Sequence, residues 1–172
     1  MAYPTNKLMD TGKTQETILG IRFNRRKRKT ASPIDLYMLA EEKGIDVDWI
    51  PMQYAASLSA ELPSGTLCIA IDPWKMDTVA KETVALGHEL GHCVTGAFYN
   101  RYATRDVMQK HENHADKWAI KRLVPVDKLD EAVADGHTEI WDLAEYFGVT
   151  EDFMRKAVCW YTYGNLATEL YF

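Results

Sequence analysis

Two histidines four residues apart, in the sequence His88-Glu89-Leu90-Gly91-His92, constrain the fold more than any other feature of this chain. On a helix, residues at i and i+4 lie about 40° apart around the axis, so both imidazoles point to one place. Neutral imidazole is a good ligand for zinc, and a catalytic zinc ion keeps one position open for water. Glu89 lies beside the histidines, where its carboxylate can take a proton from that water. The pattern therefore predicts a helix that carries two zinc ligands and a catalytic base.

The residues around this pattern predict a helix over about 77–95, with apolar residues repeating along one face. Gly87 and Gly91 leave one stripe of this helix without side chains, where another backbone can approach closely. Cys93 points about 140° away from His88 around the helix, so we interpret it as a buried small apolar residue and not as a ligand. The alternative for the whole pattern is an ordinary helix with two exposed histidines and a glutamate.

A second predicted helix, which ends before Pro125, offers the third protein ligand. Glu112 and Asp116 are four residues apart and border its predicted inner face, whereas His114 points outward. We predict Glu112 as the ligand that completes a His2Glu set, a known arrangement of catalytic zinc sites. Asp116, one turn further on, is placed to accept a hydrogen bond from the free ring nitrogen of either histidine in the first pattern. The alternative for the two acids is a solvated pair of like charges, which is mildly unfavourable.

The remaining sequence predicts a mixture of helices and short strands. Strands are expected at 45–50 and 66–71, with an irregular segment at 52–65 between them. Besides the HExxH helix, helices are expected at 34–43, from 104 or 106 to 124, and at 127–134, 138–147 and 151–161. The predicted fold class is α+β: mostly helical, with a small antiparallel sheet before the HExxH helix and a helix-turn-helix-like helical end.

Charge divides the chain into a basic arm and a domain with an acidic end. Residues 1–30 carry a net charge of +6 and close on the basic run 25–29, whereas residues 126–172 carry −7. We expect a flexible arm over 1–30 and a single domain over 31–172, whose helical part 126–172 is acidic. The basic run is either a solvated, self-repelling stretch or a patch for an acidic partner or nucleic acid. The helix-turn-helix-like segment 140–157 is net acidic, so we expect the core to bind no DNA.

Composition excludes several classes of protein. A hydrophobic fraction of 47% and a charged fraction of 26% are those of a globular domain rather than of a disordered chain. No apolar run of about 18 residues is present and the first residues lack an apolar signal core, so neither a membrane span nor secretion is indicated. The cysteines form no CxxC pair, which favours reduced thiols in a cytosol.

The two metal motifs together resemble a known family. HELGH is followed about twenty residues later by E-x-x-A-D-x-W-A and then by Leu-Val-Pro. This arrangement is similar to the ImmA/IrrE metallopeptidases, gluzincin-like proteins of bacteria and phages, over about residues 33–160. The resemblance implies His88, His92 and Glu112 as zinc ligands and Glu89 as the catalytic acid and base. Trp118 stands where the family usually has Phe, and the basic arm lies outside the likeness.

The predicted activity is that of a zinc-dependent endopeptidase, in which Glu89 takes a proton from the attacking water and returns it to the leaving amine. The strand before the metal helix is a candidate for pairing with an extended substrate; its residues are Leu67, Cys68, Ile69, Ala70 and Ile71. Five residues are candidates for stabilising the oxyanion, and spacing does not choose among them: Tyr99, Arg101, Tyr102, His111 and His114.

The resemblance also implies a substrate and a setting. Such proteins typically cleave a DNA-binding repressor encoded beside them by a phage or mobile element, in the cytosol of a bacterium. Two alternatives stay open: a toxin-like or general stress protease, and a non-proteolytic antirepressor that binds a repressor and uses zinc only for structure. Glu89 favours the enzyme, because a purely structural site has no need of a base. The sequence does not indicate the oligomeric state, the scissile bond or the activating signal.

Overall fold

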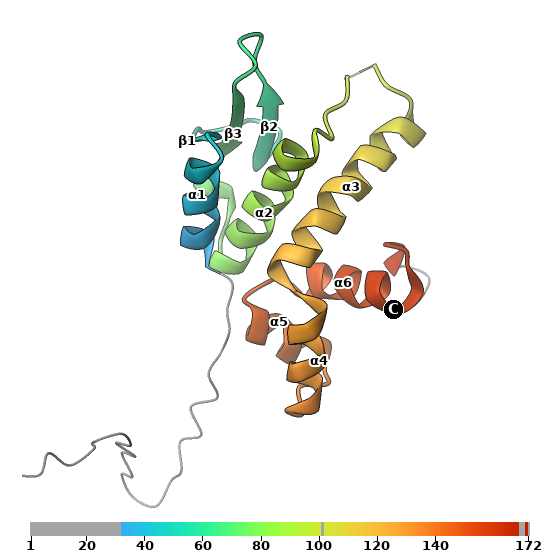
Figure 1. Ribbon diagram of the computed structural model, residues 1–172. Coiled ribbons are helices and arrows are strands. Elements are labelled where there is room, and N and C mark those ends of the chain that lie inside the picture. The colour runs from blue at the N-terminus through green and yellow to red at the C-terminus, as the bar shows by residue number, and fades with distance from the viewer. Residues whose placement is uncertain (1–31, 101, 169–170, 172) are drawn as a thin grey trace, which may run out of the picture.

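A computed structural model describes residues 32–100, 102–168 and 171, so the predicted arm over 1–30 lies outside the described residues. Within these residues, a helix, three strands and a short 3-10 turn come first, and five helices follow (Figure 1). The helices are α1 (Pro33–Glu42), α2 (Val79–Thr95), α3 (Arg105–Leu123), α4 (Val126–Ala134), α5 (Ile140–Phe147) and α6 (Glu151–Tyr163). The strands are β1 (Asp46–Trp49), β2 (Ser57–Glu61) and β3 (Leu67–Ile71), and the 3-10 turn η1 is Pro73–Lys75. This order confirms the predicted α+β class.

The sheet has the strand order β1-β3-β2, with β3 in the middle. β1 runs parallel to β3, with Val47 opposite Ile69, and β2 runs antiparallel to β3, with Ser59 opposite Ile69. The prediction of an antiparallel sheet is therefore wrong for β1, and the sheet is mixed. The cause lies in the segment between β1 and β3, for which the sequence predicts irregular structure. It contains β2, and because the chain reverses on each side of β2, β3 runs in the direction of β1.

Local signals set the ends of the two helices that flank the sheet. Ser32 caps α1 by accepting a hydrogen bond from the amide of Ile34, and Thr78 caps α2 by accepting one from the amide of Lys81. α2 ends at Gly96, whose φ of 64° lies in the left-handed region that favours glycine. None of the described helices is long and apolar enough to cross a membrane.

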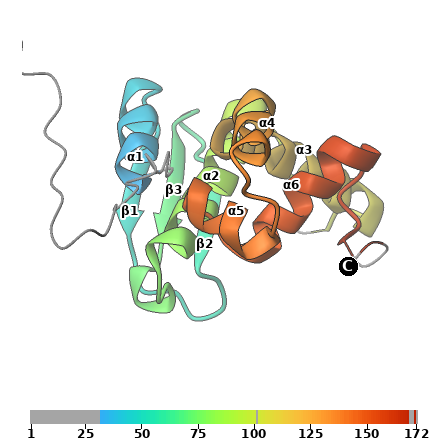
Figure 2. The same cartoon turned by 90° about the horizontal axis from the view of Figure 1, so that it is seen from below.

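The core lies between the sheet and the helices that cover it. Ile69 and Ile71 of β3 are buried together with Leu86 and Leu90 of α2 and with Leu36 of α1. α3 lies alongside α2 (Figure 1). Figure 2 shows α1 and the sheet on one side of the fold and α3, α4 and α6 on the other side. α2 therefore lies between the sheet and α3, whereas the first half of α3 is largely exposed.

The C-terminal part contains the predicted helix pair α5–α6. Gly148, with a φ of 68°, ends α5, and the Thr150 hydroxyl caps α6 by accepting a hydrogen bond from the amide of Phe153. α6 of this pair packs against α3, and the Tyr161 hydroxyl donates to the carbonyl of Val124, the residue that follows α3, at 2.8 Å. α6 also reaches α3 close to the predicted ligand Glu112, because Nζ of Lys156 lies 2.8 Å from Oδ2 of Asp116.

Candidate metal centre

Three side chains from α2 and α3 converge on one point. The Nε2 atoms of His88 and His92 lie 3.0 Å apart. The carboxylate of Glu112 lies 3.1 Å from Nε2 of His88 through Oε2 and 3.5 Å from Nε2 of His92 through Oε1. In the described part of the chain, this is the one group of three or more potential ligands whose donor atoms all lie within 4.8 Å of one another. The structure thus brings together the three residues predicted as ligands.

The other ring nitrogen of each histidine has an acceptor of its own. Nδ1 of His88 lies 2.9 Å from Oδ1 of Asp116, and Nδ1 of His92 lies 2.8 Å from the backbone oxygen of Ala97. A carbonyl oxygen only accepts, so Nδ1 of His92 carries the proton, and the same tautomer suits the carboxylate beside His88. Both Nε2 atoms are then free to coordinate, so the donor set of two imidazoles and a carboxylate fits a divalent metal such as zinc.

Sequence reasoning placed Asp116 next to one of the histidines without choosing which, and the structure places it at His88. It did not find the partner of His92. Ala97 follows Gly96 in the turn that ends α2, and its carbonyl reaches back to the ring of His92, five residues earlier. A glycine at the end of an HExxH helix is the local signal that could have indicated this backbone acceptor.

The charges of the site raise the pKa of both histidines in the absence of a metal and favour a protonated His88 at neutral pH. Burial lowers the pKa of His88, but hydrogen bonds to Asp116 and Glu112 outweigh burial and raise this pKa to about 9. Burial acts in the same direction on His92, and its bonds to Glu112 and Ala97 again raise the pKa above the usual value. The two imidazoles hold the pKa of Glu112 far below its usual range. A metal that binds both Nε2 atoms must therefore displace a proton at neutral pH.

The predicted base, Glu89, is buried and held at both oxygens. Its exposed fraction is 7%. The Ser57 hydroxyl donates to Oε1 and the Ser59 hydroxyl donates to Oε2, each at 2.7 Å. Both serines belong to β2, in the segment predicted to be irregular, so sequence reasoning missed them. The alternation Ser-x-Ser was the available signal, because alternate residues of a strand point to the same face.

Asp116 has a second partner that links the metal centre to the C-terminal part. Nζ of Lys156, on α6, lies 2.8 Å from Oδ2 of Asp116, whose other oxygen is bonded to His88. The neighbouring cation and these hydrogen bonds outweigh burial and lower the pKa of the Asp116 carboxyl. Lys156 lies 40 residues from Asp116 in sequence, so no local pattern could have indicated this contact.

The candidates for oxyanion stabilisation differ in how close they lie to the metal centre. The Tyr99 hydroxyl donates to Oε1 of Glu112 at 2.7 Å, and this bond raises the pKa of Tyr99 to about 12, so the hydroxyl keeps its proton. The ring of His111 lies 6.0 Å from that of Tyr99. Tyr102 is 78% exposed, His114 is exposed on α3, and Arg101 lies outside the described residues. Tyr99 is the candidate that contacts a predicted ligand, and His111 is its neighbour.

The strand predicted to receive the substrate cannot do so. β3, Leu67–Ile71, is the middle strand, and both of its edges are already paired. Among the residues that the structure describes, β2 has a free edge, and it carries the two serines that contact Glu89. Any extended peptide that joins the sheet beside the base must therefore pair with β2.

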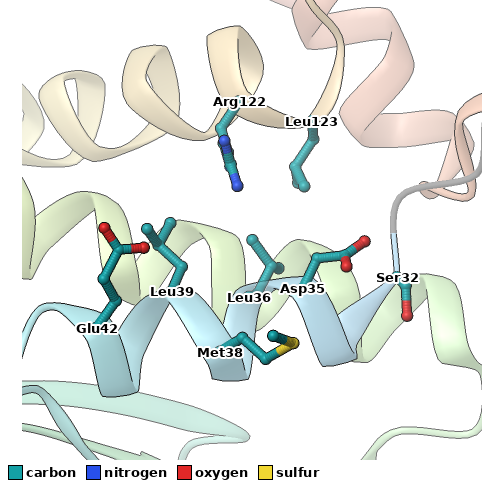
Figure 3. A pocket seen from close by; sticks show the side chains of 8 residues that line it. All are labelled: Ser32, Asp35, Leu36, Met38, Leu39, Glu42, Arg122 and Leu123. Carbon is teal, nitrogen blue, oxygen red and sulfur yellow. The ribbon is translucent and has the colours of Figure 1, made fainter.

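A cleft of about 630 Å³ leads to the metal centre. It is walled by Ser57 of β2, by His88 of α2, by Glu112 and Asp116 of α3, and by Lys156 of α6. A second pocket, of about 430 Å³, lies between α1 and the end of α3, with Leu36 and Leu39 facing Arg122 and Leu123 (Figure 3). None of the metal-centre side chains lines this second pocket. The open space beside the predicted ligands is the first cleft.

The glycine stripe of α2 has the predicted function at one of its two positions. A Cβ on Gly91 would lie 2.6 Å from the backbone oxygen of Ala115 and 2.9 Å from its Cα, so α3 crosses α2 in direct backbone contact there. At Gly87 the neighbour is a side-chain end instead, Cδ1 of Leu123 at 2.9 Å. Cys93 is buried as predicted, and burial raises the pKa of its thiol to about 12. The close crossing at Gly91 brings Glu112 within reach of the histidines.

An HExxH helix crossed by a helix that presents a glutamate and a supporting aspartate is the arrangement of a metallopeptidase. Residues 40–158 match the family model of the IrrE N-terminal-like domain, peptidase family M78, and the chain belongs to this metallopeptidase family. This match confirms the resemblance that the two metal motifs indicate. None of the curated proteins compared with the chain matches it.

Proposed function

We propose that the protein is a zinc-dependent endopeptidase that cuts an extended segment of a DNA-binding repressor in the bacterial or phage-infected cytosol. The observation that carries the enzymatic part is the convergence of His88, His92 and Glu112 beside the held carboxylate of Glu89. The free Nε2 atoms and the carboxylate of Glu112 would hold the zinc. When bound, zinc supplies a Lewis acid that polarises the scissile carbonyl and makes water more acidic.

Residues of the chain itself transfer the proton, stabilise the oxyanion and orient the metal ligands. Glu89 accepts a proton from the attacking water and delivers it to the nitrogen of the leaving amine, so it ends the cycle ionised as it began. The Tyr99 hydroxyl keeps its proton and donates a hydrogen bond to Glu112 in the metal-free site. Once Glu112 binds the zinc, that hydroxyl would be free to donate its hydrogen bond to the oxyanion instead. Asp116 and Ala97 keep both imidazoles in the tautomer that coordinates through Nε2.

The edge of β2 supports binding of an extended segment rather than of a helix. A peptide that adds to a sheet edge needs free backbone N–H and C=O groups, which a helix uses for its own hydrogen bonds. A folded repressor would therefore be cut slowly and would be cut faster when a linker is exposed or a segment unfolds. The acidic part 126–172, with a net charge of −7, suits docking against the basic DNA-reading face of such a partner.

The test begins with metal analysis of the purified protein and with Glu89→Gln, which removes the proton acceptor and keeps the shape. Both proteins are loaded with zinc and mixed with a library of peptides of known sequence, and the products are identified by mass spectrometry. We expect one zinc per chain in both proteins and cleavage by the wild type alone. Turnover by the zinc-loaded Gln variant would refute the hydrolytic role of Glu89.

The substrate is tested separately with the DNA-binding repressor encoded beside this protein. We expect a single cut, which Glu89→Gln abolishes and higher salt slows. A stable complex with no cut, identical for wild type and Glu89→Gln, would favour a non-proteolytic antirepressor. Cleavage of many unrelated folded proteins would favour a general stress or toxin-like protease.

A further inference from the structure

We propose that Ser57 and Ser59 are positioning residues of this peptidase, whose side chains hold the base while their backbone groups receive the substrate strand. The proposal rests on the peptidase function, and it assigns to β2 a second role beside that of an edge for pairing. It also makes the orientation of Glu89 depend on whether that edge is occupied.

The side chains of Ser57 and Ser59 hold the carboxylate of Glu89. Ser57 and Ser59 are alternate residues of β2, so their side chains point to the same face, toward α2. Each donates one hydrogen bond of 2.7 Å, and each carboxylate oxygen of Glu89 receives one of them. A carboxylate has about four lone-pair sites, so two hydroxyl donors fix its plane and leave a site on each oxygen for a proton. The hydroxyls keep their own protons, and the transferred proton moves between water, Glu89 and the leaving amine.

The backbone groups of Ser57 and Ser59 point to the free edge of β2. In an antiparallel pair, the residues of one strand alternate between those that bond to the partner strand and those that point away from it. The amide of Asp72 donates to the carbonyl of Ala56, and the amide of Leu62 donates to the carbonyl of Thr66, both at 2.8 Å. Even-numbered residues of this segment therefore bond to β3. The backbone groups of the odd-numbered residues, Ser57, Ser59 and Glu61, point to the free edge.

The same two residues thus face the base with their hydroxyls and the substrate with their backbone. An edge strand with unpaired backbone groups is freer to fluctuate than a paired one, because it has hydrogen bonds on one side only. A peptide that pairs with Ser57 and Ser59 would reduce this freedom and hold both hydroxyls against Glu89. Substrate pairing would in this way complete the alignment of the base, and an empty edge would leave it less well aligned.

The activity test compares Ser57→Ala and Ser59→Ala with Ser59→Thr, which keeps a hydroxyl. The matched control is Ser64→Ala, since Ser64 bonds to Thr66 in the β2–β3 turn and contacts neither Glu89 nor a ligand. The probe is the peptide that the wild type cuts best in the library described above. For each Ala variant at 57 and 59 we expect kcat to fall about 10–100-fold, with KM within about 2-fold and zinc content unchanged, as for a misaligned catalytic group. Ser59→Thr should restore most of the lost kcat, and Ser64→Ala should match the wild type.

The backbone role predicts the opposite effect on the kinetic constants: KM should change and kcat should not. Glu61→Pro removes an amide that points to the free edge and leaves the bonds to β3 intact, a position where an edge strand tolerates proline. We expect it to raise KM at least about 5-fold while kcat changes little, because it removes substrate binding and not the alignment of the base. Ala variants at 57 and 59 with unchanged kcat would overturn the side-chain role, and an unchanged KM in Glu61→Pro would overturn the backbone role.

A measurement without substrate separates this proposal from the peptidase function itself. A double-mutant cycle of Ser59→Ala and Glu89→Ala in urea unfolding of the zinc-loaded protein reports the hydroxyl–carboxylate contact directly. We expect Ser59→Ala to lower the unfolding midpoint in the wild type and to have a smaller effect when Glu89 is already Ala. Additive shifts would refute the contact even in an active enzyme. A zinc-loaded wild type that cuts no peptide would refute the peptidase function, while the cycle would still decide whether the serines hold Glu89.

Discussion

Replacing Gly91 with Ala tests whether the crossing of α2 and α3 sets the metal geometry. The added Cβ would lie 2.6 Å from the oxygen, 2.9 Å from Cα and 3.0 Å from the carbonyl carbon of Ala115, whereas ordinary contact begins at 3.4 Å. All three neighbours are backbone atoms, so rotation of a side chain cannot relieve the overlap. The helices must separate by about 0.8 Å at this point, which is the difference between 3.4 Å and the shortest contact.

This separation acts directly on the ligands. Gly91 lies between the two histidines in α2, and Ala115 lies between Glu112 and Asp116 in α3. Metal sites tolerate changes of about 0.2 Å in ligand distance, so a shift several times larger should weaken zinc binding at least about 10-fold. Stability should change less, because overpacking costs about 1–3 kcal/mol and alanine gains about 1 kcal/mol over glycine inside a helix.

Gly87→Ala is the matched control. It makes the same chemical change in the same helix, but its new Cβ meets the movable end of Leu123, 2.9 Å away. We expect zinc affinity close to that of the wild type and stability equal or slightly higher. Zinc affinity is measured by competition with a chromophoric chelator, and the melting temperature is measured with and without zinc. Wild-type zinc affinity in Gly91→Ala, or an equal loss in both variants, would refute this account of the crossing.

Three further predictions concern the residues of the metal centre. Glu112→Ala should lose zinc, while His114→Ala, on the exposed side of the same helix, should keep it, as metal analysis after dialysis would show. The reverse result would mean that the ligand set is wrong. Asp116→Ala should weaken zinc binding about 10–100-fold in the chelator competition, because it removes the acceptor that orients His88. An unchanged zinc affinity would contradict that role of Asp116. In the metal-free protein the pKa of His88 is raised from 6.5 to about 9, so its stabilising contribution is complete below pH 6.5 and is lost as pH rises through 9. The melting temperature of the metal-free protein should therefore fall over that range, and a constant or rising value would contradict the charge state assigned to the site.

Most of the metal centre could be predicted because its information is local. The i,i+4 spacings in two helices place His88, His92, Glu112 and Asp116 on facing stripes, and the structure brings all four together. The orientation of the sheet could not be obtained in this way. β2 has the sequence SLSAE, with no β-branched or aromatic residue, so neither its existence nor the parallel pairing of β1 with β3 has a local signal. The strand exists because β3 pairs with it and because its serines bond to Glu89.

The ion pair between Lys156 and Asp116 has a consequence for how the protein is made. A ribosome adds about 5–20 residues per second, so the 40 residues between the two side chains correspond to about 2–8 s of synthesis. During that interval His88, His92 and Glu112 have already been synthesised, while the lysine that pairs with Asp116 has not. The link between the metal centre and α6 can therefore form only after α2 and α3 have both been synthesised.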